Sequence, residues 1–241
     1  MKHTPAFLTL IVAASALAQT APTPAPAAPA KSAWTQTHNL ALATDYIFRG
    51  VSQINGDGLA LSGGTDVTHD SGFSAGLWAS NVSFGGSSLE LDVYAGYSKT
   101  LGEATLSAGA ISYHYEGVEA ANTTEVYVGV AAYGVSVKYS SSLTDYFGLN
   151  NSDGVGYLSV GYSREIPGVK DLTLGLAFGA TTAEGDQEAY NDYKVSLSYP
   201  VAGYTASLAY TDVSGNEDVA GTNAALKSAV DEITFSLSKS F

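Results

Sequence analysis

The clearest structural signal in the chain is the segment Leu89-Glu90-Leu91-Asp92-Val93-Tyr94-Ala95-Gly96-Tyr97-Ser98. Apolar side chains occupy every second position, so in an extended strand they all lie on one face. The other face carries Glu90 and Asp92, whose carboxylates need water or a partner. A strand of this kind separates an apolar environment from an aqueous one, as the wall of a membrane-spanning β-barrel does.

The same alternation recurs from about Gln36 to Phe241. It predicts twelve strands, most with the roughly 9–11 residues that a tilted strand needs to cross the hydrocarbon layer. The expected strands cover residues 38–49, 59–68, 72–82, 88–99, 104–115, 124–132, 135–143, 156–165, 171–181, 191–200, 203–212 and 230–241. The two faces of 104–115 cannot be told apart from the sequence.

Alternation also occurs in secreted β-sandwiches, but two further features favour a barrel. The strand count is even, and long connections alternate with short turns, with the segment 83–87 as the one short exception among the long ones. Closure follows from physics, because a sheet in lipid pairs every backbone group only by joining its edges. The sequence therefore predicts an all-β fold: a closed antiparallel up-and-down transmembrane β-barrel of twelve strands.

The chain stops on an aromatic residue. One face of the last expected strand carries the apolar residues Ile233, Phe235, Leu237 and Phe241. Lys239 is the one charged residue on this face, and its long side chain can extend to the lipid headgroups. Outer-membrane proteins characteristically end in this way. The expected partners are therefore outer-membrane lipid and the barrel-assembly machinery, which would engage the C-terminal strand ending at Phe241.

The N-terminus predicts export. Lys2, an apolar stretch and the Ala16-Leu17-Ala18 site give a signal peptide over residues 1–18. An Ala- and Pro-rich periplasmic tether over 19–35 follows, and the barrel takes up 36–241. The expected localisation is the cell outer membrane of a Gram-negative bacterium, after secretion to the periplasm.

Composition excludes several other functions. The net charge of −13 and the scattered basic residues argue against nucleic acid as a partner. There is no cysteine, and His38, His69 and His114 lack metal-ligand spacing, so no metal or other cofactor is expected. Beyond residue 18 no apolar run approaches the roughly 20 residues of a transmembrane helix.

If the apolar face meets lipid, the other face lines the lumen. The candidate lumen-lining residues are Asp45, Arg49, Asp66, Glu90, Asp92, Glu125, Lys138 and Lys194. Arg49 is placed to pair with Asp66 or Asp45, and these charges form either a structural network or a selectivity ring. Their acid excess favours cations.

Two further expectations concern the rims and the interior. Tyrosines near the expected strand ends suit the membrane interfaces; they are Tyr46, Tyr97, Tyr113, Tyr139, Tyr162, Tyr199 and Tyr210. Small inward residues, among them Gly64 and Gly96, leave residual space in a barrel of intermediate size, unless one of the long loops folds in and plugs it.

One part of the sequence resembles a known family. The segment Asp45-Tyr46-Ile47-Phe48-Arg49-Gly50-Val51-Ser52-Gln53 is similar to the opening signature of the TorF family of Gram-negative outer-membrane porins. The likeness continues through Gly76-Leu77-Trp78-Ala79-Ser80-Asn81-Val82 and Glu90 to Tyr97, so it covers about residues 40–97. It implies an outer-membrane location and a porin-like role.

The predicted function is passive diffusion of small solutes or ions through a narrow pore, without enzymatic activity. Two alternatives stay open. A phospholipase-type barrel would need a Ser–His pair, for which Ser112 and His114 are the candidates. A receptor or structural barrel would work through its outer loops, of which 213–229 is the longest.

Overall fold

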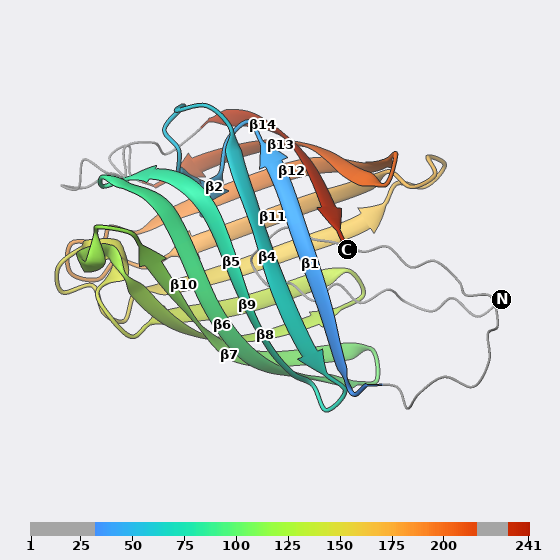
Figure 1. Ribbon diagram of the computed structural model, residues 1–241, viewed down its shortest axis with the longest axis horizontal. Coiled ribbons are helices and arrows are strands. Elements are labelled where there is room, and N and C mark those ends of the chain that lie inside the picture. The colour runs from blue at the N-terminus through green and yellow to red at the C-terminus, as the bar shows by residue number, and fades with distance from the viewer. Residues whose placement is uncertain (1–31, 216–230) are drawn as a thin grey trace.

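The protein is a closed antiparallel β-barrel (Figure 1). The computed structural model describes residues 32–215 and 231–241. Its twelve wall strands are β1 Trp34–Ala43, β4 Ala60–His69, β5 Phe73–Phe84, β6 Ser87–Leu101, β7 Ala104–Tyr115, β8 Thr123–Ala132, β9 Val135–Ser142, β10 Gly156–Glu165, β11 Thr173–Thr181, β12 Tyr190–Val201, β13 Tyr204–Ser214 and β14 Glu232–Ser240. Four short elements complete it: the hairpin strands β2 Ile47–Phe48 and β3 Val51–Ser52, and the 3₁₀ turns η1 Glu119–Ala121 and η2 Tyr146–Gly148.

The sheet closes where the first strand meets the last. On one side β1 pairs with β14, with Asn39 opposite Ser240. On the other side β1 pairs with β4 over its whole length, from Trp34 to Ala43. Every wall strand therefore has two antiparallel neighbours, which leaves no free edge. The predicted twelve-stranded closed barrel is confirmed.

The two ends of the barrel differ. One end carries the long connections, while the other carries short turns, such as Tyr133-Gly134 with φ of 54° and 82°. The first residues of β1 and the C-terminal Phe241 lie at the short-turn end (Figure 1). Strand β1 begins at Trp34, inside the range expected for the tether. The signal peptide (1–18) and the rest of the tether up to residue 31 lie outside the described residues, as does most of the 213–229 loop.

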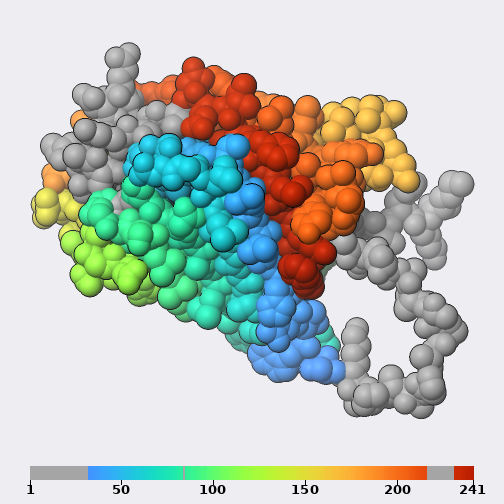
Figure 2. Space-filling model, turned by 45° about the horizontal axis from the view of Figure 1, so that its top comes forward, coloured from blue at the N-terminus to red at the C-terminus, as the bar shows by residue number. Residues whose placement is uncertain are grey.

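The outer surface of the wall is apolar. Alternate residues of each strand are exposed, and they include Val128 (58% exposed), Leu208 (52%) and Phe235 (49%). Strand β7 also alternates, with Tyr113 and Tyr115 buried and their neighbours more exposed, so its two faces are now distinguished. Figure 2 shows strands from both ends of the chain side by side on one outer face. In the described part of the chain no helix is long and apolar enough to cross a membrane.

The first strand is shorter than predicted. The expected strand 38–49 leaves the wall after Ala43, and the chain turns into the hairpin β2–β3. Arg49 (φ 48°) and Gly50 (φ 77°) form its tip, and two successive positive φ values are what a tight two-residue hairpin turn requires. A Cβ on Gly50 would collide with the Val213 side chain, so the tip packs directly against the wall. Alternation continues through this segment, which is why it resembled one long strand.

Candidate functional site

The hairpin β2–β3 crosses the bore of the barrel. It starts beside β1 and β4, yet Arg49 at its tip binds Glu125 on β8, far around the closed sheet. The contact is bidentate, with Nη1 to Oε1 at 2.8 Å and Nη2 to Oε2 at 2.7 Å. Both side chains are almost fully buried. A bidentate contact of this kind fixes the orientation of the two side chains in addition to neutralising their charges.

Aromatic groups surround the Arg49 guanidinium. It donates to the Tyr146 hydroxyl at 3.0 Å. Its Cζ lies 4.1 Å from the ring centroid of Tyr157 and 4.8 Å from that of Phe48. Burial opposes the charge on Arg49, but Glu125 together with Tyr146 and Tyr113 outweighs this effect, so the pKa of Arg49 lies above its ordinary value. The guanidinium therefore stays charged and holds the hairpin tip against β8.

The base of the hairpin contacts the wall on the β5–β6 side. Tyr46 donates to Glu90 Oε1 at 3.1 Å, and its ring lies 5.2 Å from that of Trp78. Burial, together with Glu90, raises the pKa of Tyr46 well above its usual value, so the hydroxyl keeps the proton that it donates. Asp92 lies directly across the ladder from Trp78. Among the described residues, Trp78 Nε1, Glu90 Oε2 and Asp92 Oδ1 are buried without a hydrogen-bond partner.

The third contact of the hairpin is with β12 and β13. Val51 packs with Tyr190 and Val213 in a small apolar cluster. Next to it, Tyr157 donates to Asp192 at 3.0 Å. Residues of β2–β3 thus touch the wall on three sides of the bore.

Loops from the same end pack onto the hairpin. Tyr146 and Phe147 of η2 are buried, and Phe147 stacks edge-on against Phe48 and Tyr113. The cluster built in this way consists of Trp78, Val82, Tyr94, Ile111, Tyr113, Tyr115, Ala121, Tyr146, Phe147, Leu149 and Val155, with Tyr46, Phe48 and Val118 against it. The long-loop half of the bore is therefore constricted by packed side chains.

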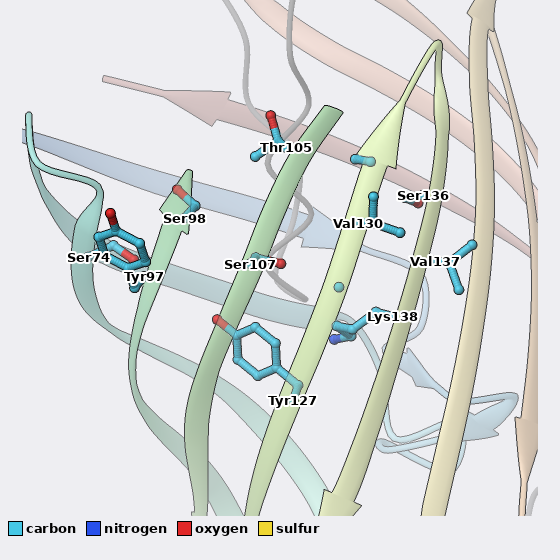
Figure 3. A pocket seen from close by; sticks show the side chains of 12 residues that line it. Ser74, Tyr97, Ser98, Thr105, Ser107, Tyr127, Val130, Ser136, Val137 and Lys138 are labelled. Carbon is cyan, nitrogen blue, oxygen red and sulfur yellow. The ribbon is translucent and has the colours of Figure 1, made fainter. Parts of the chain in front are cut away.

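The other half of the bore is lined by small polar groups. A cavity of about 50 Å³ lies there against β5–β9 (Figure 3). Its lining includes Ser98, Ser107, Tyr127, Ser136 and Lys138. The prediction of residual space and the prediction of a plugging loop thus apply to different halves of one barrel.

The structure places the eight predicted lumen-lining residues as follows. Asp45, Arg49, Glu90, Asp92 and Glu125 are buried around the hairpin; Asp66 accepts a hydrogen bond from Tyr94; Lys138 faces Tyr127; Lys194 is exposed on the same face of β12 as Asp192. The predicted pairing of Arg49 with Asp66 or Asp45 is wrong. Because the chain leaves the wall after Ala43, Arg49 reaches Glu125 instead.

For two of the tyrosines, the predicted position at the rim of the barrel is also wrong. Tyr46 turns into the bore with the hairpin, and Tyr113 lies on the inward face of β7. Tyr146, which lies in a loop without periodicity, and Tyr157 were not predicted from the sequence. Asp192 was not predicted either, although it lies two residues from Lys194 on the same face of β12 and could be detected by that spacing.

The structure also shows the surroundings of the alternative enzyme pair. Ser112 and His114 lie on the outward face of β7, and the Ser112 hydroxyl shares a hydrogen bond with Thr124 Oγ1 at 3.0 Å. Within residues 32–215 and 231–241 no group of three or more His, Asp or Glu side chains is arranged to hold a metal ion.

Comparison with known proteins gives one family and several similar folds. The family model Gcw_chp, described as bacterial protein of unknown function, matches residues 27–241. No curated protein matches the sequence. The resemblance to TorF-type porins remains a prediction, because the matching model carries another name.

Solved structures share the architecture. The KdgM porin has a TM-score of 0.57 at 12% identity, over 85% of this chain and 98% of that one. The outer-membrane protein Omp33 of Acinetobacter baumannii has a TM-score of 0.51 at 10% identity, over 86% of this chain and 97% of that one. At such low identity the likeness shows the fold, a porin-like barrel.

Proposed function

The chain belongs to the Gcw_chp family of bacterial proteins of unknown function, and we propose that it is an outer-membrane pore through which small cations and small solutes diffuse along the hairpin β2–β3. The observation that carries this proposal is the charge around the hairpin. In the described residues the buried charged side chains are five acids and one base: Asp45, Glu90, Asp92, Glu125 and Asp192 against Arg49.

The outer face supports the location. Apolar side chains cover the outside of a closed sheet with no free edge, which suits hydrocarbon and not water. At the short-turn end, Lys239 Nζ lies 5.1 Å from the ring centroids of both Tyr204 and Phe241, an arrangement typical of an interface where long cationic side chains snorkel. Engagement of the C-terminal strand by the assembly machinery is part of the same proposal.

The route past the hairpin follows the β5–β6 wall. There the Trp78 N–H can donate to water, and Glu90 Oε2 and Asp92 Oδ1 can accept from water or bind a cation. The Arg49–Glu125 pair closes the opposite side, so permeating ions pass Glu90 and Asp92, neither of which forms an ion pair within the described residues. Such a path favours cations and conducts weakly.

Planar-bilayer recording of the purified protein tests the proposal. We expect discrete openings, and in a potassium chloride gradient a reversal potential displaced toward that of potassium. The double variant Glu90→Gln, Asp92→Asn is expected to reduce this displacement, whereas Lys99→Met on the outward face of β6 leaves it unchanged. A reversal potential displaced toward chloride, or an absence of openings, refutes the proposal.

A further inference from the structure

Lys138, a lysine in the bore, forms no ion pair with the described residues. Lys138 lies on the inward face of β9, two residues from Ser136 and two from Ser140. Among the described residues, ion pairs join Arg49 to Glu125 and Lys170 to Asp171, so Lys138 has none. Glu125 on the adjacent strand commits both carboxylate oxygens to Arg49. An ammonium group left in this position is stabilised by an anion.

The space in front of Lys138 is small and rich in hydroxyl groups. The cavity there has a volume of about 50 Å³, enough for on the order of four water molecules. Its inward hydroxyl-bearing side chains are Ser74, Ser98, Thr105, Ser107, Ser136 and Tyr127. In Figure 3, Lys138 and Tyr127 extend from neighbouring strands toward the same region, with Nζ 5.5 Å from the ring centroid.

Two glycines keep this space free. A Cβ on Gly109 would lie 2.5 Å from the Tyr127 hydroxyl, and one on Gly96 would lie 2.7 Å from it. Their absence of side chains lets the phenol ring lie along the wall of β6 and β7 instead of crossing the bore. The face of the Tyr127 ring and the Lys138 ammonium group therefore both border the cavity.

We propose that this cavity is a binding site for a small hydroxylated carboxylate of about three carbons, reached from the short-turn end of the barrel. Lys138 neutralises the carboxylate, the serine and threonine hydroxyls exchange hydrogen bonds with the hydroxyls of the solute, and the Tyr127 ring packs on its carbon atoms. The approach from the long-loop end is narrowed by the hairpin. The inference rests on the proposed pore, since the site lies in the same bore.

Titration calorimetry on the full-length mature protein in detergent tests the site with three probes of equal carbon number. Glycerate carries the carboxylate and hydroxyls, glycerol only hydroxyls, and propionate only the carboxylate. We expect glycerate to bind at least roughly tenfold more tightly than either of the others, because each lacks one set of polar contacts. Equal binding of glycerol and glycerate overturns the proposal.

Variants locate the site. Lys138→Met is expected to weaken glycerate binding roughly tenfold or more, and Lys138→Arg to retain much of it. Lys99→Met is the matched control, because it removes a lysine from the outward face beside Ser98. Unchanged glycerate binding by Lys138→Met contradicts the assignment. If Lys138→Met does not fold, the comparison of the three probes on the native protein still decides.

Calorimetry measures binding without ion flow, so the proposed binding site and the proposed pore can be refuted independently of each other. Glycerate binding by a barrel that shows no openings supports the site and refutes the pore. Openings in a bilayer together with no selective glycerate binding refute the site alone.

Discussion

Replacing residues 45–58 with a two-residue Asn-Gly turn is expected to raise the single-channel conductance roughly threefold or more, because the hairpin obstructs the bore of a barrel wide enough to conduct. The replacement is compatible with the wall. Strands β1 and β4 pair up to Ala43 and Ala60, so Thr44 and Leu59 lie close enough for a tight turn. Planar-bilayer recording of both proteins under the same salt provides the measurement.

Asp57→Asn is the matched control for this deletion. Asp57 is in the same loop but is exposed, and it accepts a hydrogen bond from Ser83 instead of entering the bore. Its conductance is expected to match that of the native chain. A folded hairpin-less barrel with native conductance would show that β2–β3 does not limit flow.

Breaking the buried ion pair from either side is expected to cost about 3–5 kcal/mol of unfolding free energy. In Arg49→Met the Glu125 carboxylate loses its bidentate partner, and in Glu125→Met the guanidinium keeps only Tyr146 and its ring contacts. The double variant is expected to recover most of the loss, because neither buried charge then remains. Denaturant titration of the barrel in lipid vesicles, followed by tryptophan fluorescence, measures all three.

An exposed pair gives the comparison for this cycle. Lys170 and Asp171 lie in a short turn, with Nζ 3.8 Å from Oδ2, and Lys170 is almost fully exposed. Lys170→Met is expected to change the stability by less than about 1 kcal/mol. If the double variant of the buried pair loses the sum of the two single losses, the two side chains do not act on each other.

The barrel wall was predictable from local pattern. Strand period, turn residues and the need to close a sheet in lipid are each visible in short windows, so strands such as 104–115 and 156–165 are predicted at their observed bounds. The inward position of Glu90 and Asp92 followed from the same alternation. Whether these residues act as a selectivity ring remains a prediction.

The hairpin was not predictable in the same way. Residues 45–52 alternate like a wall strand, but the chain leaves the wall after Ala43 and reverses direction at Arg49 and Gly50, where φ is positive. Gly50 is only a weak indication of a two-residue turn in the sequence, and Arg49 gives no indication of one. The partner of Arg49 is 76 positions away along the chain and lies across the bore, a relation that no local window contains. Tyr146 joins the site from a loop for the same reason.

The central claim is that the polar face of the wall lines the conducting path while the apolar face meets lipid. Because the chain has no cysteine, single cysteines can be introduced on β10 at Ser159, on the inward face next to Tyr157, and at its outward neighbour Leu158. A charged thiol reagent added during bilayer recording is expected to reduce the current of Ser159→Cys and to leave that of Leu158→Cys unchanged. Equal effects at both positions, or block at Leu158→Cys alone, would contradict the account.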